Sequence, residues 1–337
     1  MPVNANFAAV SDNLLLATIL CYTVAMLAYA VEYAFGRRGL VAASASAPAA
    51  QRVLVGAGGP PATLTADGDL TGVTAGPTGR GRSVSFGRMA VALTVFGWLA
   101  HVGSLVFRGL SVGRVPWGNM YEFAVAVCLI TVTAYLVLLA RQPVRYLGAF
   151  VMLPVVLLLG LAGTVLYTRA APLVPALNSY WLKIHVTAAI LASGVFLVGA
   201  TTSVLYLVRD SYERRTAAGT ALRFPATLGV RLPGADALER ATFRVIAFGF
   251  PIWTFAVIAG AIWAEAAWGR YWGWDPKETW AFIAWVIYAA YLHARATAGW
   301  RGRRAVGVAL LGWGAMMFNL FAVNILISGL HSYAGLN

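Results

Sequence analysis

The amino-acid sequence predicts an all-α, polytopic membrane protein with about eight transmembrane helices and both termini outside. Of its 337 residues, 60% are hydrophobic and only 11% are charged, whereas a soluble domain carries about 25% charged residues. The mean hydropathy is +0.74. A compact water-soluble core could not bury this much apolar surface, so the composition is typical of a membrane protein.

Eight apolar runs approach the roughly 20 residues that a helix needs to cross a bilayer. No basic residue precedes the first run, and Arg37 and Arg38 follow it, which is the reverse of a cleaved signal peptide. We therefore expect this run to remain as a helix with its N-terminus outside. In chain order the runs are 13–35, 89–108, 120–140, 146–167, 185–208, 246–264, 277–295 and 305–330.

The runs divide the chain into three parts. Residues 1–35 hold the first predicted transmembrane helix. Residues 36–88 are rich in small and polar side chains over most of their length and are predicted to form a flexible cytosolic loop. Residues 89–337 are predicted to form a seven-helix membrane domain that carries the chemistry.

The basic residues set the orientation. With the N-terminus outside, the inside segments are 36–88, 141–145, 209–245 and 295–304, and they hold 19 of the 25 Lys and Arg residues. Such an excess marks the cytoplasmic side of a membrane protein. The net charge of +13 therefore encodes orientation, and no nucleic-acid partner is expected.

The two cysteines give no sign of redox chemistry. Cys21 and Cys128 lie in separate apolar runs and form no C-x-x-C pair. Thiol–disulfide exchange by this chain is therefore not expected, and both residues are predicted to be buried, free cysteines.

Five tryptophans and a tyrosine crowd into residues 263–280, which we call the Trp-rich loop. An aromatic belt at the membrane interface is one explanation, but a belt is spread over all helix ends. Such density in one loop favours a stacking platform for a flat, partly polar ligand. Part of the loop has a structural role, because Asp275, Pro276 and Glu278 match the N-cap, first position and third position of a capping box.

Two of the four histidines are expected to flank this loop. The predicted topology places His185 at the outer start of the fifth run and His331 at the outer end of the eighth. Two histidines on different helices at one depth are the geometry that clamps a haem iron from both faces. We predict both as iron ligands. The predicted haem-binding neighbours are Trp268, Tyr271, Trp272, Trp274, Asp275 and Trp280.

The other two histidines lie within predicted spans, where ionisable side chains are usually functional. His293 follows Pro276 by 17 residues, which is about 26 Å along a helix and so near the inner face. His101 follows Arg88 by 13 residues, about 20 Å from the inner side. A second, internal haem is one hypothesis, with His293 an iron ligand and His101 a candidate. Hydrogen-bonded contacts between helices are the alternative.

The turn between the second and third runs carries a second cluster of polar residues. Asn119 is a candidate N-cap with Glu122 at the third helical position. Arg114 in this turn, and Lys183 and Lys277 beside the histidines, are candidates to neutralise haem propionates. An ordinary interfacial role is the alternative for each of these cations.

These residues resemble the CcsA or ResC family (named CcsB in some lineages) of System II cytochrome c biogenesis. The family patterns are W-G-x-Y-W-x-W-D-P-K-E-T-W in the loop and P-x-x-N-x-Y-E in the preceding turn, and the resemblance covers roughly residues 90–337. The matching residues are Trp268, Gly269, Tyr271, Trp272, Trp274, Asp275, Pro276, Lys277, Glu278, Thr279, Trp280, Pro116, Asn119, Tyr121, Glu122, His185, His293 and His331.

The resemblance implies a function in cytochrome c maturation. It implies that haem b is conveyed across the plasma membrane and bound by His185 and His331 on the extracytoplasmic side, with His293 as an internal ligand and no secure counterpart for His101. It also implies holocytochrome c synthase (haem lyase) activity in a complex with a ResB-type membrane subunit. The expected partners are an apocytochrome c with a C-x-x-C-H motif and a thioredoxin-like reductant.

Three other classes remain open on sequence alone. A System I haem-handling subunit would share the Trp-rich loop, although the eight runs and the Gly-Leu-His-Ser ending favour System II. A b-type haem protein that transfers electrons commonly carries two histidines on one helix, and no predicted helix here does. A transporter for another amphipathic solute would carry carboxylates in mid-span, and Glu32 is the nearest case.

Overall fold

The computed structural model describes residues 3–35, 78–172 and 179–331, and these residues form helices and no strands. The predicted all-α class is therefore confirmed. The helices are α1 (Ala5–Phe35), α3 (Thr78–Val112), α4 (Met120–Arg141), η1 (Arg145–Leu147), α5 (Gly148–Thr164), α6 (Tyr180–Ala217), η3 (Ala226–Arg231), α7 (Ala235–Trp268), α8 (Pro276–Thr297), α9 (Arg303–Met317), the π turn η4 (Phe318–Ala322) and α10 (Val323–Leu326).

Seven helices of the described chain are long and apolar enough to cross a membrane, which confirms a polytopic membrane protein. The remaining predicted run, 277–295, is also a helix, α8, but its 22 residues include Lys277, Glu278, His293 and Arg295. The helix α3 begins at Thr78, before the predicted start at residue 89, and residues 36–77 of the predicted loop lie outside the described residues.

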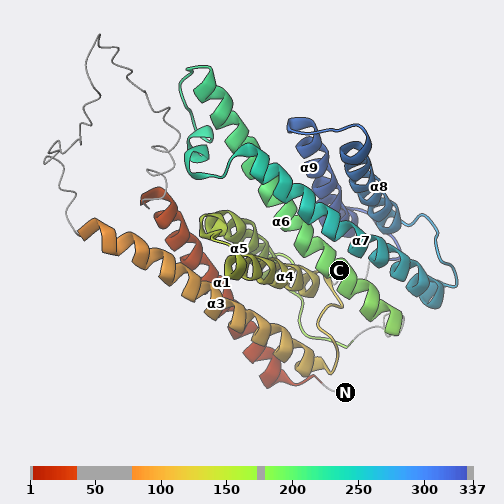
Figure 1. The fold of residues 1–337 in the computed structure, drawn as a ribbon. Helices are drawn as coiled ribbons and strands as arrows, with labels where there is room; N and C mark the ends of the chain where they lie inside the picture. The colour runs from red at the N-terminus through yellow and green to blue at the C-terminus, as the bar shows by residue number, and fades with distance from the viewer. Residues whose placement is uncertain (1–2, 36–77, 173–178, 332–337) are drawn as a thin grey trace, which may run out of the picture.

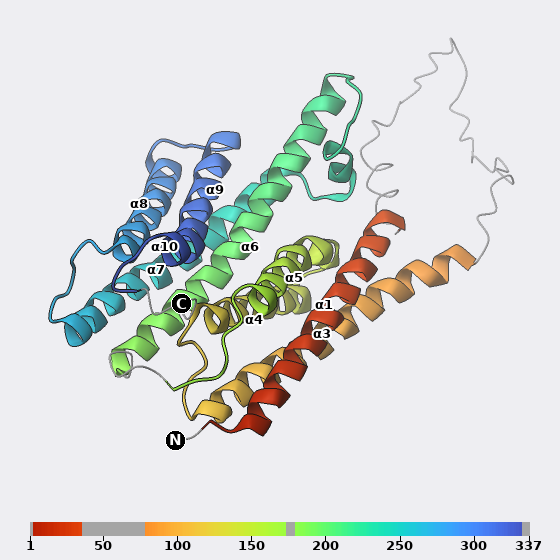
Figure 2. The same ribbon diagram turned by 180° about the vertical axis from the view of Figure 1, so that it is seen from behind.

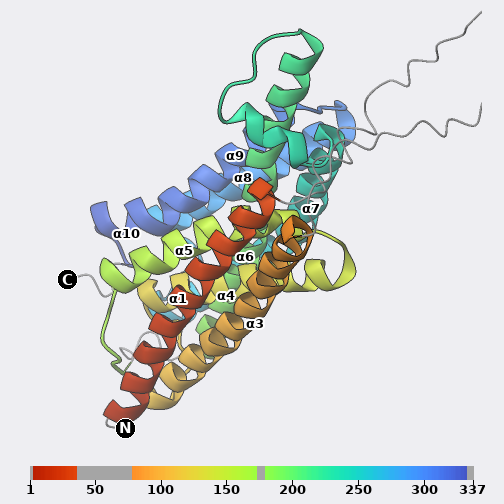
Figure 3. The same cartoon turned by 90° about the vertical axis from the view of Figure 1, so that its left-hand side faces the viewer.

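The helices pack side by side as a bundle of pairs. The pair α1–α3 and the pair α8–α9 lie on opposite flanks, with α4, α5, α6 and α7 between them (Figures 1 and 2). Seen from the side, α1 and α3 run alongside each other in front of α4 and α5 (Figure 3). The helix α6 is the central element, because 83% of its most apolar stretch is buried inside the protein.

The outward faces of the bundle are apolar. Leu20 and Leu27 of α1 and Phe96 and Leu110 of α3 are each more than half exposed. Large apolar side chains on an outer surface are costly in water and are the normal covering of a helix in lipid. The bundle is therefore built to be surrounded by hydrocarbon.

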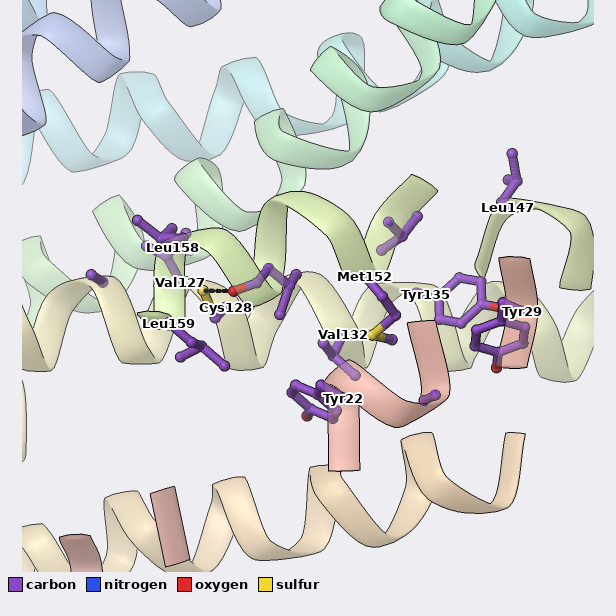
Figure 4. Close-up of a cluster of buried hydrophobic side chains, with 14 of the residues drawn as sticks. Tyr22, Tyr29, Val127, Cys128, Val132, Tyr135, Leu147, Met152, Leu158 and Leu159 are labelled. Atoms are coloured by element: carbon purple, nitrogen blue, oxygen red, sulfur yellow. Dashed lines mark hydrogen bonds between the residues drawn. The ribbon is translucent and has the colours of Figure 1, made fainter. Parts of the chain in front are cut away.

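One part of the core joins α1, α4 and α5. Figure 4 shows Tyr22 and Tyr29 of α1 facing Tyr135 of α4 and Met152 of α5, and all four are at most 2% exposed. Cys128 lies in the same cluster, fully buried, with its Sγ 3.8 Å from the carbonyl of Val155. Both cysteines are free, and Cys21 is partly buried.

Interhelical polar contacts distinguish two ends of the bundle. At the end that we call the arginine-rich end, Glu32 pairs with Arg145, Asp210 with Arg303 and Glu239 with Arg295. At the opposite end, which we call the histidine end, the backbone N–H of Asn4 donates a hydrogen bond to the carbonyl of Ser111, and His331 hydrogen-bonds to Asp275. The start of α1 and the end of the described chain therefore lie at the same end. Which membrane face each end meets remains a prediction from the charge distribution.

Candidate functional site

A large cavity opens at the histidine end, and we call it the histidine cavity. The space between its walls amounts to about 1320 Å³, including the open solvent at its mouth. Its walls come from the turn before α4 and the start of α4, from α6, α7, α8 and the end of α9, from the Trp-rich loop, and from the segment that runs from η4 to His331. The lining is mostly apolar, and its polar members include His185, His331, Asn319 and Lys277. Apolar walls with a few convergent polar groups are typical of a small-molecule site.

His185 lies in the second turn of α6, which begins at the N-cap Ser179. Its Nδ1 lies 2.8 Å from the backbone carbonyl of Ala256 on α7. A carbonyl can only accept, so Nδ1 carries the proton and Nε2 carries the lone pair. Gly260 permits this approach, because a Cβ at that position would lie 2.8 Å from the imidazole. The ring is thus held by α7 in the tautomer that suits an Nε2 metal ligand.

His331 is oriented by the residue that begins α8. Its Nδ1 donates to Asp275 Oδ1 at 2.8 Å, and the other carboxylate oxygen accepts the backbone N–H of Leu330 at 2.7 Å. Asp275 is also the N-cap of α8, and Glu278 completes the predicted capping box. A carboxylate behind an imidazole fixes its orientation and raises its basicity as a metal ligand.

The ionisation of Asp275 follows from these bonds. Burial by itself raises the pKa of this carboxyl, but the hydrogen bonds from His331 and from the backbone of Leu330 outweigh burial and lower the pKa from 3.8 to about 2. Asp275 is therefore charged throughout the ordinary pH range.

The ring of Trp263 contacts both histidines. It stacks on His185 at 6.1 Å between centroids and 10° between planes, and it meets His331 edge-on at 5.8 Å. The ring centroid of Trp268 lies 5.0 Å from that of His331. Sequence reasoning placed Trp263 only at the start of the loop, because the helix was expected to end at residue 264. In the structure α7 continues to Trp268, and Trp263 is 2% exposed.

The structure distributes the other predicted aromatic residues between the cavity and its surroundings. Tyr271 and Trp272 line the cavity. Trp274 is 66% exposed, has a positive φ of 57° and packs against Trp272. Positive φ is strained for a bulky side chain, and such strain often occurs at functional sites. Trp280 packs against Phe318, with 4.0 Å between ring centroids and 34° between ring planes, and is not among the residues that line the cavity.

The structure does not bring His293 and His101 together. His293 is exposed near the arginine-rich end of α8, whereas His101 is fully buried in α3. The two helices lie on opposite flanks of the bundle (Figures 1 and 2). The Nε2 of His101 lies 3.0 Å from the carbonyl of Val125, and its Nδ1 lies 3.4 Å from Tyr22. Both ligand roles therefore remain predictions, and that of His101 would require these bonds to break.

A buried ion cluster supports the turn that forms one wall of the cavity. Glu122 is fully buried and accepts hydrogen bonds from Arg108 at 3.0 Å, from Arg114 at 2.8 Å and from the backbone of Gly118 at 2.8 Å. Asn119 is the N-cap of α4, as predicted, through the N–H of Glu122. Sequence reasoning missed the bond to Arg108, whose spacing from Glu122 carries no local signal.

Comparison with known proteins identifies the family. Residues 117–331 match a family model described as "Cytochrome C assembly protein", and they include every helix that lines the histidine cavity. The chain is also similar to proteins called "Cytochrome c biogenesis protein CcsA". It is 36% identical over 299 residues to that of Gloeobacter violaceus (74% of this chain, 86% of the relative). It is 33% identical over 281 residues to that of Pyropia yezoensis (74% and 88%) and 44% identical over 177 residues to that of Guillardia theta (50% and 59%). The chain therefore belongs to the CcsA family of cytochrome c assembly proteins.

Proposed function

We propose that this protein binds haem in the histidine cavity and presents it there for covalent attachment to apocytochrome c. The observation that carries the proposal is that His185 and His331 both contact Trp263 in one cavity, each with its Nδ1 fixed by an acceptor. The role in cytochrome c maturation is that of the family to which the chain belongs.

The chemistry of the lining fits haem b as the transported substrate. Neutral imidazole nitrogens are common axial ligands of haem iron, and two of them favour tight six-coordinate binding. Trp263, Trp268 and Trp272 supply aromatic surface for a flat macrocycle. The cavity opens at the end of the bundle, which suits presentation to a partner and distinguishes the site from the mid-membrane haem of an electron-transferring b-type protein.

The attachment step is a redox-neutral addition. Each thiol of a C-x-x-C-H motif adds across a vinyl group of haem, so that sulfur bonds one vinyl carbon and the proton goes to the other. The substrate cysteines must be reduced beforehand. The two cysteines of this chain lie within α1 and α4 and do not line the cavity, so a separate thioredoxin-like reductant is part of the proposal.

We infer that the haem lyase activity belongs to a complex with a ResB-type subunit in the plasma membrane. The site would lie on the extracytoplasmic side, because 19 of 25 basic residues fall in the segments assigned to the inside. Two experiments test this function. The detergent-purified protein is expected to show a Soret band and, with dithionite, sharp α and β bands. Co-expression with a ResB-type subunit and a C-x-x-C-H cytochrome is expected to yield covalent haem. A haem-free protein that matures no cytochrome would reject the proposal.

Asp275→Asn is expected to weaken haem binding about tenfold or more, because loss of a group that orients a metal-bound histidine typically costs 10- to 100-fold. Asparagine caps helices as well as aspartate does, so α8 should be retained. Titration of the Soret band measures the affinity, and the melting temperature of the haem-free protein checks the cap. Equal affinity in the two proteins would show that the carboxylate does not support His331.

The same carboxylate predicts a dependence of stability on pH. Because the pKa of Asp275 is lowered on folding from 3.8 to about 2, its contribution is present above about pH 4 and is lost as the pH falls toward 2. Thermal unfolding between pH 2 and 6 should therefore show a smaller acid-induced loss of stability in Asp275→Asn than in the wild type. An equal loss of stability between pH 6 and pH 2 in the two proteins would contradict the assignment of this pH dependence to Asp275.

A further inference from the structure

Lys277 is the one Lys or Arg side chain that lines the histidine cavity in the described part of the chain. It follows Pro276 at the start of α8, and its Nζ lies 2.9 Å from the backbone carbonyl of Asn319. The two other cations that the sequence suggested for propionate binding lie elsewhere. Lys183 is exposed and does not line the cavity, and Arg114 is paired with Glu122.

The ammonium of Lys277 has no carboxylate within ion-pair distance in residues 3–35, 78–172 and 179–331. Glu278 also lines the cavity, but it accepts the N–H groups of Gly273 and Asp275 and pairs with Arg270. An ammonium group has three N–H donors and is costly to remove from water without an anion. Asp275 acts on this ammonium only from beyond ion-pair distance, so a direct counter-charge within the cavity would come from a ligand.

Asn319 adds a second polar group at the same wall. It lies in the π turn Phe318–Ala322, and such turns interrupt the regular hydrogen-bond ladder of a helix. Its backbone carbonyl accepts from Lys277, and its side chain also lines the cavity. The side chain is 6% exposed, and its Oδ1 has no hydrogen-bond partner among the described residues. Rotation of this amide by half a turn would present its Nδ2–H groups to an acceptor.

We propose that Lys277 and Asn319 together bind a carboxylate of the ligand, so that the cavity selects a planar ligand with a free carboxylate. The inference rests on the proposed function, in which the ligand is haem and the carboxylate is a propionate. The propionates and the vinyl groups of haem occupy opposite edges of the ring. Anchoring a propionate at Lys277 therefore turns the vinyl edge away from this wall, which makes Lys277 a specificity-determining and positioning residue for attachment.

The test compares haem b with haem b dimethyl ester, in which both carboxylates are blocked. Both are titrated into the detergent-purified, haem-free full chain and followed by the Soret band. The wild type is expected to bind haem b roughly tenfold or more tightly than the ester, the range for a hydrogen bond to a charged group. Lys277→Met is expected to bind both ligands with the affinity that the wild type has for the ester. Lys277→Arg should recover part of the preference.

Lys183→Met is the matched control, because it removes a lysine near the same cavity without changing its lining. It should behave as the wild type does. Equal affinity of the wild type for haem b and its ester would overturn the inference while leaving haem binding intact, and so would a preference that persists in Lys277→Met. Failure of the wild type to bind either ligand would instead reject the proposed function. If Lys277→Met does not fold, Lys277→Gln takes its place. The comparison of haem b with its dimethyl ester in the wild type tests the inference in either case.

Discussion

Replacing either His185 or His331 by glycine is expected to remove most of the haem signal of the purified protein. Each imidazole donates a hydrogen bond through Nδ1, His185 to Ala256 and His331 to Asp275, so the lone pair that can bind iron is on Nε2. Loss of a ligand should cost more than the 10- to 100-fold that follows loss of a group that only orients one. The measurement is the visible spectrum before and after dithionite, at equal protein concentration.

Imidazole in the buffer separates loss of a ligand from loss of the fold. Glycine leaves room for a free imidazole, so the Soret and α bands of both variants should return when it is added. His293→Gly is the matched comparison, because His293 is exposed near the opposite end of α8. Unchanged spectra in the His185 and His331 variants, with a signal lost only in His293→Gly, would indicate that haem binds at the arginine-rich end instead.

Glu122→Gln is expected to destabilise the protein by about 3–5 kcal/mol, the range for breaking a buried ion pair. Glu122 is fully buried and Arg108 is 2% exposed, so the substitution leaves two guanidinium groups without their counter-charge. The turn that carries Trp117 into the cavity wall should loosen at the same time, because Gly118 loses a charged acceptor. We therefore expect a lower melting temperature in detergent and weaker haem binding.

Glu265→Gln provides the control for this prediction. Glu265 is an exposed acidic residue near the end of α7, and substitutions at such surface positions usually change stability by less than about 0.5 kcal/mol. A melting temperature of Glu122→Gln equal to that of Glu265→Gln would show that the cluster is not needed for the fold. A large drop only in Glu122→Gln would establish the cluster as the support of the cavity wall.

Features that depend on neighbouring residues could be predicted from the sequence. The eight apolar runs all appear as helices, and the caps at Asn119 and Asp275 are as expected, because each depends on residues within one helical turn. The proximity of His185 and His331 to the Trp-rich loop also followed, since a bilayer places alternate ends of successive helices at one level. That level is where the structure brings both side chains to Trp263.

Contacts between distant residues could not be predicted in the same way. The helix α7 continues to Trp268, about a turn beyond the apolar run, so Trp263 is a buried helical residue and not part of a loop. His101 could be a ligand or a helix contact on sequence grounds, and only the packing of α1 and α4 around it shows its bonds to Tyr22 and Val125.

By itself, then, the sequence determined an all-helical membrane protein of the CcsA type and the residues from which its site is drawn. Hydropathy and capping are local properties, and they are readable along the chain. Only the tertiary structure decided that Asp275 orients His331 and that Glu122 neutralises Arg108. The same holds for the hydrogen bond from Lys277 to the carbonyl of Asn319. Each of these contacts joins different elements. A polar group buried away from water is costly unless it is hydrogen-bonded, and its partner is whichever residue the packing of the helices places beside it.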